Sequence, residues 1–154
     1  SLLIANDAIE MFLLIQDNSA EDSLRTALQS YAAADLKLYQ NKKEEALQLF
    51  LAILQKHKGE SIEEGTLFKV GKIYEEKGHF NKALTYYQNI LDNHKDGIYK
   101  DEALYFSAEI YRKHLLDNEK AKALYEKVVL EHPDSLYYTE SRKQYRTLRG
   151  DSTI

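Results

Sequence analysis

The chain has 154 residues, of which 44% are hydrophobic and 30% charged. This length fits one domain, and the apolar content excludes a disordered segment. The 21 basic and 25 acidic residues give a formal charge of −4, which is too balanced to predict nucleic-acid binding. The absence of cysteine excludes disulfides, thiolate metal sites and a cysteine nucleophile.

Long helices with short turns are favoured, because only six glycines and one proline interrupt the chain. No apolar run approaches the roughly 20 residues that span a bilayer. The chain starts at Ser1 and its only methionine is Met11, so we expect it to be part of a longer protein.

The first predicted helix is Leu2–Gln16, within an N-terminal segment 1–17. Its apolar residues lie around more than one face, so the helix needs neighbours on two sides. One neighbour would be the next helix, and the other would be an earlier repeat or a second copy of the chain. This helix is therefore a candidate surface for forming a homo-oligomer.

The first predicted helix pair spans 20–58. Ser19 and Asp22 have the spacing of a capping box, and apolar residues recur at steps of three and four up to Gln40. Asn41, three residues before Glu44, is predicted to cap the partner helix.

Two more pairs follow, at 61–95 and 99–132, and then a single helix at 135–149 and a polar tail at 150–154. Ser61 and Glu64 predict the start of the second pair, and Gly78 the end of its first helix. The third pair is predicted as helices 100–116 and 118–131. Pro133 breaks the chain before the last helix.

The three pairs repeat one pattern at a pitch of 37 to 38 residues. The coinciding positions are Ala34, Gly71 and Ala108, then Ala46, Ala83 and Ala121, and then Phe50, Tyr87 and Tyr125. Such a period predicts an all-α fold, a solenoid of antiparallel helix pairs. The third repeat has one extra residue near His114, which predicts a longer turn. A further step of 37 residues reaches Tyr145, so the last helix is predicted to be a cap.

The middle repeat resembles the tetratricopeptide repeat, with its order of large apolar, small, tyrosine, small and aromatic residues. The residues that carry this order are Leu67, Val70, Gly71, Tyr74, Ala83 and Tyr87. The resemblance covers residues 20–149 and is weakest in the first repeat, where Lys37 replaces the tyrosine. Ile90 and Lys95 depart from the usual alanine and proline. The resemblance implies a right-handed superhelix.

The long pitch, together with the segment 132–137, is similar to a variant common in bacterial envelope proteins. This similarity favours the bacterial envelope or periplasm over the cytoplasm as the location.

In this family the first helix of each pair lines a concave groove that binds a peptide or a partner's helix. An aromatic residue recurs there at steps of 37 residues, and a charged residue follows each four positions later. The predicted groove residues are Tyr31, Asp35, Phe68, Lys72, Tyr105, Glu109 and Arg112. A second interpretation stays open, in which the aromatic side chains pack between repeats and the charges only meet water. Asp35 and Glu109 argue against the carboxylate clamp of cytosolic relatives, which uses asparagines and lysines.

No catalytic residue, cofactor or metal site is predicted. His57, His94 and His132 recur at the end of each second helix, where they would offset the negative helix terminus rather than converge on a metal. Adjacent glutamates such as Glu63 and Glu64 point about 100° apart and predict no acid pair. A basic stripe in the last helix is interpreted as solvated, with an acidic partner or lipid headgroups as the alternative. Its residues are Arg142, Lys143, Arg146 and Arg149.

We therefore expect a non-enzymatic scaffold that binds a protein or peptide segment in its groove, with no small-molecule substrate and no nucleic acid. Two alternatives remain. The array could serve self-association or spacing at the C-terminus of a larger protein, or it could be the docking arm of an enzyme whose catalytic part lies elsewhere.

Overall fold

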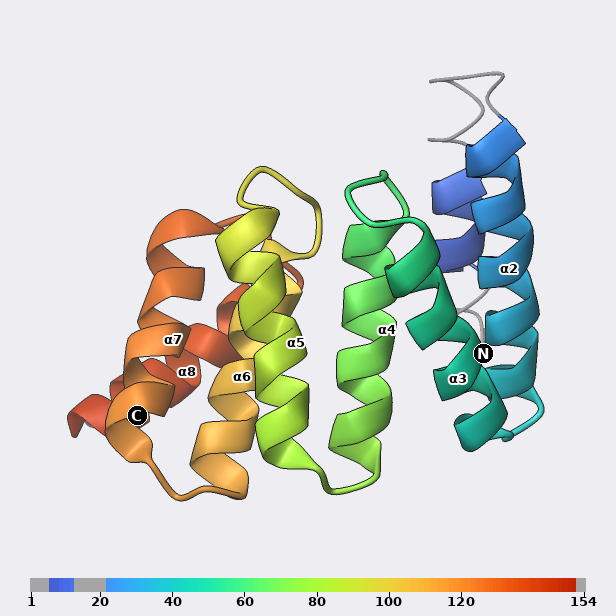
Figure 1. The fold of residues 1–154 in the computed structure, drawn as a ribbon. Coiled ribbons are helices and arrows are strands. Elements are labelled where there is room, and N and C mark those ends of the chain that lie inside the picture. The colour runs from blue at the N-terminus through green and yellow to red at the C-terminus, as the bar shows by residue number, and fades with distance from the viewer. Residues whose placement is uncertain (1–5, 13–21, 152–154) are drawn as a thin grey trace. The chain divides into compact units, whose positions relative to one another are not determined.

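The structure is a computed structural model that describes residues 6–12 and 22–151. These residues form helices and turns, with no strand among them (Figure 1). Residues 6–12 are helical, in agreement with the predicted helix Leu2–Gln16 as far as that helix is described. The rest of that prediction, the cap at Ser19 and residues 152–154 lie outside the described residues. The all-α helical-repeat fold is confirmed, and the right-handed winding stays a prediction.

The fold consists of two compact units, Ser1–Ile73 and Tyr74–Ile154. The N-terminal unit contains α2 (Asp22–Tyr39), α3 (Lys43–Lys56) and most of α4 (Glu63–Glu76). Helices α2 and α3 pack against each other as the first predicted pair. Their contact uses the small and aromatic repeat positions, because Ala34, Ala46 and Phe50 are fully buried.

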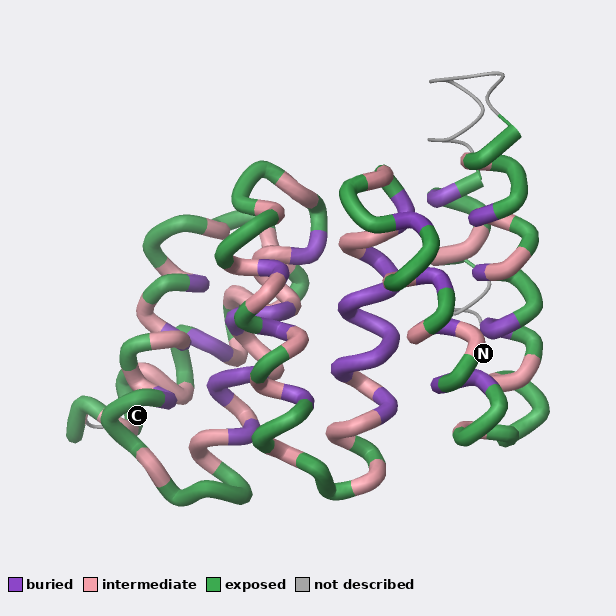
Figure 2. Tube along the Cα trace, in the orientation of Figure 1, coloured by how far each residue is buried: buried purple, intermediate pink, exposed green. Residues whose placement is uncertain are grey.

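Helix α4 carries the longest buried run of the N-terminal unit, which is visible as a nearly continuous stretch in Figure 2. It begins at Glu63 and not at the predicted cap Ser61. The carbonyl of Ile62 accepts from the N–H of Thr66, and the carboxylate of Glu63 accepts from the N–H of Gly59. The first main-chain bond of α4 therefore starts at Ile62, and the Glu63 side chain ties the preceding turn to the helix.

Asn41 does not cap α3, in contrast to the prediction. Lys42 holds the N-cap position, and Asn41 has a φ of 61°, in the left-handed region. The N–H groups of Asn41 and Lys42 donate to the carbonyls of Leu38 and Lys37, which closes the end of α2. Asparagine adopts this conformation at a lower cost than most residues, so it terminates one helix here instead of starting the next.

The C-terminal unit contains α5 (Phe80–Asn93), α6 (Lys100–Lys113), α7 (Asn118–Glu131) and α8 (Tyr138–Arg149). Helix α6 packs against both α5 and α7, and α7 packs against α8. Ala108 and Ala121 are fully buried beside the ring of Tyr125. The small residues let α6 and α7 approach closely, and the tyrosine fills the space next to them.

The predicted longer turn of the third repeat is present. Helix α6 ends at Lys113, earlier than predicted, and residues 114–117 lead to α7, with Leu116 at a φ of 54°. The corresponding turn after α4 is residues 77–79, with Gly78 at a φ of 80°. The residue two positions before the second helix is left-handed in all three turns, and the third repeat has a leucine where the second has glycine, which adopts this region readily.

The last helix packs through a few bulky side chains. In α8 only Ser141 is buried, while Tyr145 and Leu148 pack against the cluster around Tyr125. Gly150 ends the helix with a φ of 95°. Among the helices that the structure describes, none combines the length and the apolar character needed to cross a membrane.

Candidate protein-interaction surface

The predicted aromatic row divides between buried and accessible side chains. Tyr31 is fully buried in the N-terminal unit, where its ring meets that of Phe50 edge to face at 5.4 Å. Phe68 is 7% exposed. Tyr105, in the C-terminal unit, is half-buried. Tyr31 and Phe68 are therefore packing residues in this structure. Tyr105 is the aromatic residue of the row whose side chain a partner could contact.

The charged residues that follow this row also differ in their surroundings. Asp35 is 5% exposed, and its Oδ1 lies 3.4 Å from Lys69 Nζ, which is also 3.3 Å from Asp7 Oδ2. Burial raises the pKa of Asp35 to about 6, although the Lys69 ammonium lowers it. Lys72 is half-buried. Asp35 is thus part of a buried ion cluster. The sequence analysis did not identify Lys69 as a member of this cluster, although a lysine inside the apolar run 67–70 indicates a buried charge.

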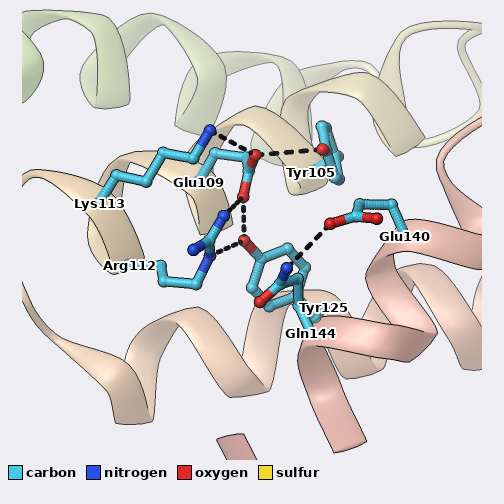
Figure 3. A network of polar contacts seen from close by, with 7 residues as sticks. All are labelled: Tyr105, Glu109, Arg112, Lys113, Tyr125, Glu140 and Gln144. Carbon is cyan, nitrogen blue, oxygen red and sulfur yellow. Dashed lines mark hydrogen bonds and ion pairs between the residues drawn. The ribbon is translucent and has the colours of Figure 1, made fainter. Parts of the chain in front are cut away.

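Glu109 lies at the centre of a hydrogen-bonded network on α6 (Figure 3). Its Oε1 accepts from the hydroxyl of Tyr105 at 3.1 Å and pairs with Lys113 Nζ at 3.1 Å. Its Oε2 accepts from Arg112 Nη2 at 2.8 Å and from the hydroxyl of Tyr125. Arg112 Nε also donates to the Tyr125 hydroxyl at 3.0 Å. The structure thus joins three predicted residues, Tyr105, Glu109 and Arg112, in one network.

The network fixes the charge of its members. Burial alone would raise the pKa of Glu109, but bonds from Tyr125, Arg112 and Lys113 outweigh it and lower the pKa to about 2. Burial and the adjacent carboxylate raise the pKa of both tyrosines. Glu109 is therefore ionised at neutral pH, and it holds the Arg112 guanidinium in place with a charge-assisted bond.

Helix α8 and the turn before it add residues that sequence reasoning missed. The ring of Tyr137 stacks on that of Tyr105 at 4.4 Å and 17°. Ser135 Oγ donates to Asp101 and accepts from the N–H of Tyr137, which holds this turn against α6. On α8, Gln144 Nε2 donates to Glu140 Oε1 at 2.8 Å, near Tyr105 in Figure 3. The repeat pattern stopped at the third pair, so it gave no signal for these residues.

We call this region the α6–α8 surface; it consists of Tyr105, Glu109, Arg112, Lys113, Tyr137 and Glu140. The side chain of Arg112 is 26% exposed and that of Lys113 is 51% exposed. The bonds of Arg112 within the network use Nε and Nη2. The surface thus combines a fixed pair of aromatic rings with an oriented guanidinium.

The repeated histidines occupy the predicted positions. His57, His94 and His132 are the C-cap residues of α3, α5 and α7, and each N–H donates to the carbonyl four residues earlier. His57 Nδ1 also lies 2.5 Å from Glu60 Oε2. Within residues 6–12 and 22–151, no group of three or more histidine or acidic side chains could hold a metal ion.

The basic stripe of α8 is exposed along its length. Arg149 Nε donates to Asp151 Oδ1 at 3.0 Å, and its guanidinium lies 5.0 Å from the centre of the Tyr145 ring. The end of the stripe therefore has local partners within the chain.

Helix pairs with buried small residues at a fixed pitch, and a partly exposed aromatic and charged surface, define an all-helical repeat protein. A family model described as a tetratricopeptide repeat matches residues 66–97 and 102–135, which correspond to the second and third predicted repeats. These two segments are tetratricopeptide repeats. Proteins of this family generally mediate protein–protein interaction and are generally non-enzymatic scaffolds. A comparison with curated proteins finds no match.

Proposed function

We propose that this chain is a non-enzymatic interaction module that binds a segment of a partner protein on the α6–α8 surface. The observation that carries the proposal is the network that holds Tyr105 and Arg112 in fixed positions within a repeat of an interaction family. Tyrosine and arginine are the residue types that most often dominate the energy of protein interfaces. Fixed side chains lose little conformational entropy on binding, which favours affinity.

The surface suggests the chemistry of the segment. The rings of Tyr105 and Tyr137 are stacked with their centres 4.4 Å apart, and together they offer an apolar contact to a partner side chain. The Arg112 guanidinium beside them can donate to a carboxylate or a backbone carbonyl of the partner. Glu109 uses both oxygens within the chain, so it positions Arg112 and does not itself accept from the partner. We therefore expect an apolar or aromatic side chain followed by an acceptor group.

The predicted extension of the site to Tyr31, Asp35, Phe68 and Lys72 has weaker support. Tyr31, Asp35 and Phe68 are buried within their own unit. A partner that uses these three side chains would have to displace their present contacts. We therefore assign recognition to the C-terminal unit.

Selection of binding peptides tests the proposal. A displayed library of random twelve-residue peptides would be selected on the immobilised chain, and recovered peptides would be measured by fluorescence anisotropy. Arg112→Gln should weaken binding about tenfold, because one charge-assisted bond is lost. Lys127→Gln, an exposed change on α7, is the matched control and should have no effect. If no recovered peptide binds Arg112→Gln more weakly than it binds the wild type and Lys127→Gln, the assignment is refuted.

Self-association is the second candidate function. A cleft of about 310 Å³ between residues 6–12 and α2 is lined by Ala8, Ile9, Phe12, Leu28, Gln29 and Ala32. Ile9 is 56% exposed and Phe12 is 42% exposed, which is the kind of apolar surface that a second copy could cover. Sedimentation at high concentration tests this function: the wild type should associate, and Phe12→Ser should associate less. A wild-type monomer throughout would count against self-association.

The remaining expectations are also proposals. The docking of this array to an enzyme can be decided from the sequence of the full-length protein. A location in the bacterial envelope can be decided by fractionation of cells that express it.

A further inference from the structure

A second cleft lies in the C-terminal unit, apart from the α6–α8 surface. Its volume is about 640 Å³, and it is lined by residues of α5, α6 and α7. Helix α6 contributes Ser107 and Tyr111, which lie two positions after Tyr105 and Glu109 of the α6–α8 surface. Two positions correspond to about 200° around a helix, so the two sites are on opposite faces of α6. Nothing in the predicted groove accounts for this cleft.

The wall formed by α5 carries polar side chains at regular steps. Asn81, Thr85, Asn89 and Asn93 follow one another at intervals of four residues along the cleft. Four residues of a helix rise about 6 Å. Two residues of an extended chain span about 6.6 Å, and groups on the same edge of such a chain repeat every two residues. The wall thus presents hydrogen-bonding groups at close to the spacing of an extended peptide backbone.

Hydrogen bonds within α5 orient these side chains. Asn93 Nδ2 donates to Asn89 Oδ1 at 2.7 Å, and Gln88 Nε2 donates to Asp92 Oδ1 at 2.9 Å. A carboxamide carries both a donor and an acceptor, so the Asn89–Asn93 pair still has an NH₂ group and a carbonyl for a ligand. The pair still has one free NH₂ group and one free carbonyl if the oxygen and nitrogen positions of both carboxamides are exchanged. A peptide group needs one donor and one acceptor of this kind.

The charged and apolar residues of the cleft lining indicate which class of ligand it can bind. Asp92 is the single charged residue among the described residues that line the cleft, and it is bonded to Gln88. Lys120 Nζ lies 5.4 Å from the centre of the Tyr111 ring, and a single lysine supplies little of the positive charge that a nucleic acid or an anionic lipid surface needs. Leu84 and Leu124, with the ring of Tyr111, form an apolar part of the lining. Alternate side chains of an extended chain could lie on this part.

We propose that the α5–α7 cleft binds an extended, uncharged segment of a partner protein. The backbone of the segment pairs with Asn89 and Asn93, and its apolar side chains rest on Leu84 and Leu124. This second binding surface is independent of the proposed α6–α8 function, and the two can be occupied by different segments.

The test uses the full chain and the displayed peptide library, with recovered peptides synthesised and measured by calorimetry. Asn89→Ala combined with Asn93→Ala should weaken one class of peptides at least tenfold, since two hydrogen bonds are lost. Alanine is the better helix former, so α5 should persist, and its circular dichroism verifies this. Asn118→Ala removes an exposed carboxamide from α7 and is the matched control. Asn93→Lys, which places a charge at the exposed edge, should weaken the same class.

The outcomes separate the two proposals. Peptides that lose affinity with the asparagine variants and retain it with Arg112→Gln support the cleft. If every recovered peptide is insensitive to the asparagine variants, or none is recovered, the inference is overturned, whatever Arg112→Gln shows. Maltohexaose and cellohexaose serve as neutral glycan probes. Binding of either glycan that depends on Asn89 and Asn93, with no peptide binding, would overturn the assignment to a peptide.

Discussion

Glu109→Gln is the substitution whose effect the structure defines most fully. Glutamine keeps the size and shape of the side chain but removes the charge that Tyr105, Tyr125, Arg112 and Lys113 all contact. Glu109 is only 12% exposed, so water does not replace these contacts. We expect the variant to fold with a less stable C-terminal unit.

The magnitude follows from the pKa of Glu109. The folded chain lowers this pKa from its ordinary value of 4.5 to about 2. Each unit of pKa corresponds to 1.36 kcal/mol, so the ionised form stabilises the fold by about 3 kcal/mol at pH 7. For a chain of this size the melting temperature should fall by about 6 to 12 °C.

The pH dependence gives an independent check. Because the folded pKa is depressed, the contribution is complete above pH 4.5 and is lost as the pH falls towards 2. By pH 3.5 the difference between wild type and variant should shrink to about 2 kcal/mol.

Urea unfolding followed by circular dichroism at pH 7, 4.5 and 3.5 measures these differences. Glu119→Gln is the control, because Glu119 is 83% exposed and pairs with Lys122 at the surface; its effect should stay below about 0.5 kcal/mol. A loss of less than 1 kcal/mol for Glu109→Gln at pH 7, or a difference that does not change with pH, would refute the reasoning.

Two further substitutions test the packing and the buried charges. Ala121→Leu should destabilise the fold by roughly 1 to 3 kcal/mol in urea unfolding, because Ala121 is fully buried beside Ala108. Ala123→Leu, on the exposed side of α7, is the control and should have little effect. Equal losses of stability in the two variants would contradict the packing of α6 against α7. Asp35→Asn should remove a pH dependence: the folded pKa of about 6 lies above the ordinary 3.8, so the wild type loses about 2 kcal/mol of stability as the pH rises from 4 to 6. Thermal melts at several pH values measure this dependence. If the stability of Asp35→Asn falls with pH as steeply as that of the wild type, another group is responsible.

The sequence determined the class of fold because its signals are local and periodic. Small residues such as Ala34, Ala46 and Ala121 are fully buried, as their recurrence predicts. Helix ends were also predictable where one residue type dominates the turn, as at Gly78, whose φ of 80° suits glycine. Asn41 was assigned the wrong role because asparagine serves both as an N-cap and as a left-handed terminator.

The tertiary structure decided which of the recurring residues are accessible and what each one contacts. Tyr31 and Tyr105 are equivalent in the repeat, yet Tyr31 is fully buried and Tyr105 stacks, half-buried, on Tyr137. Asp35 and Glu109 are also equivalent, yet their pKa values move in opposite directions. The repeat fixes the direction in which a side chain leaves its helix, since that depends on residue spacing alone. Its burial, charge and partners depend on groups of other helices, such as Tyr125 for Glu109, Lys69 for Asp35 and Tyr137 for Tyr105, and folding alone brings these together.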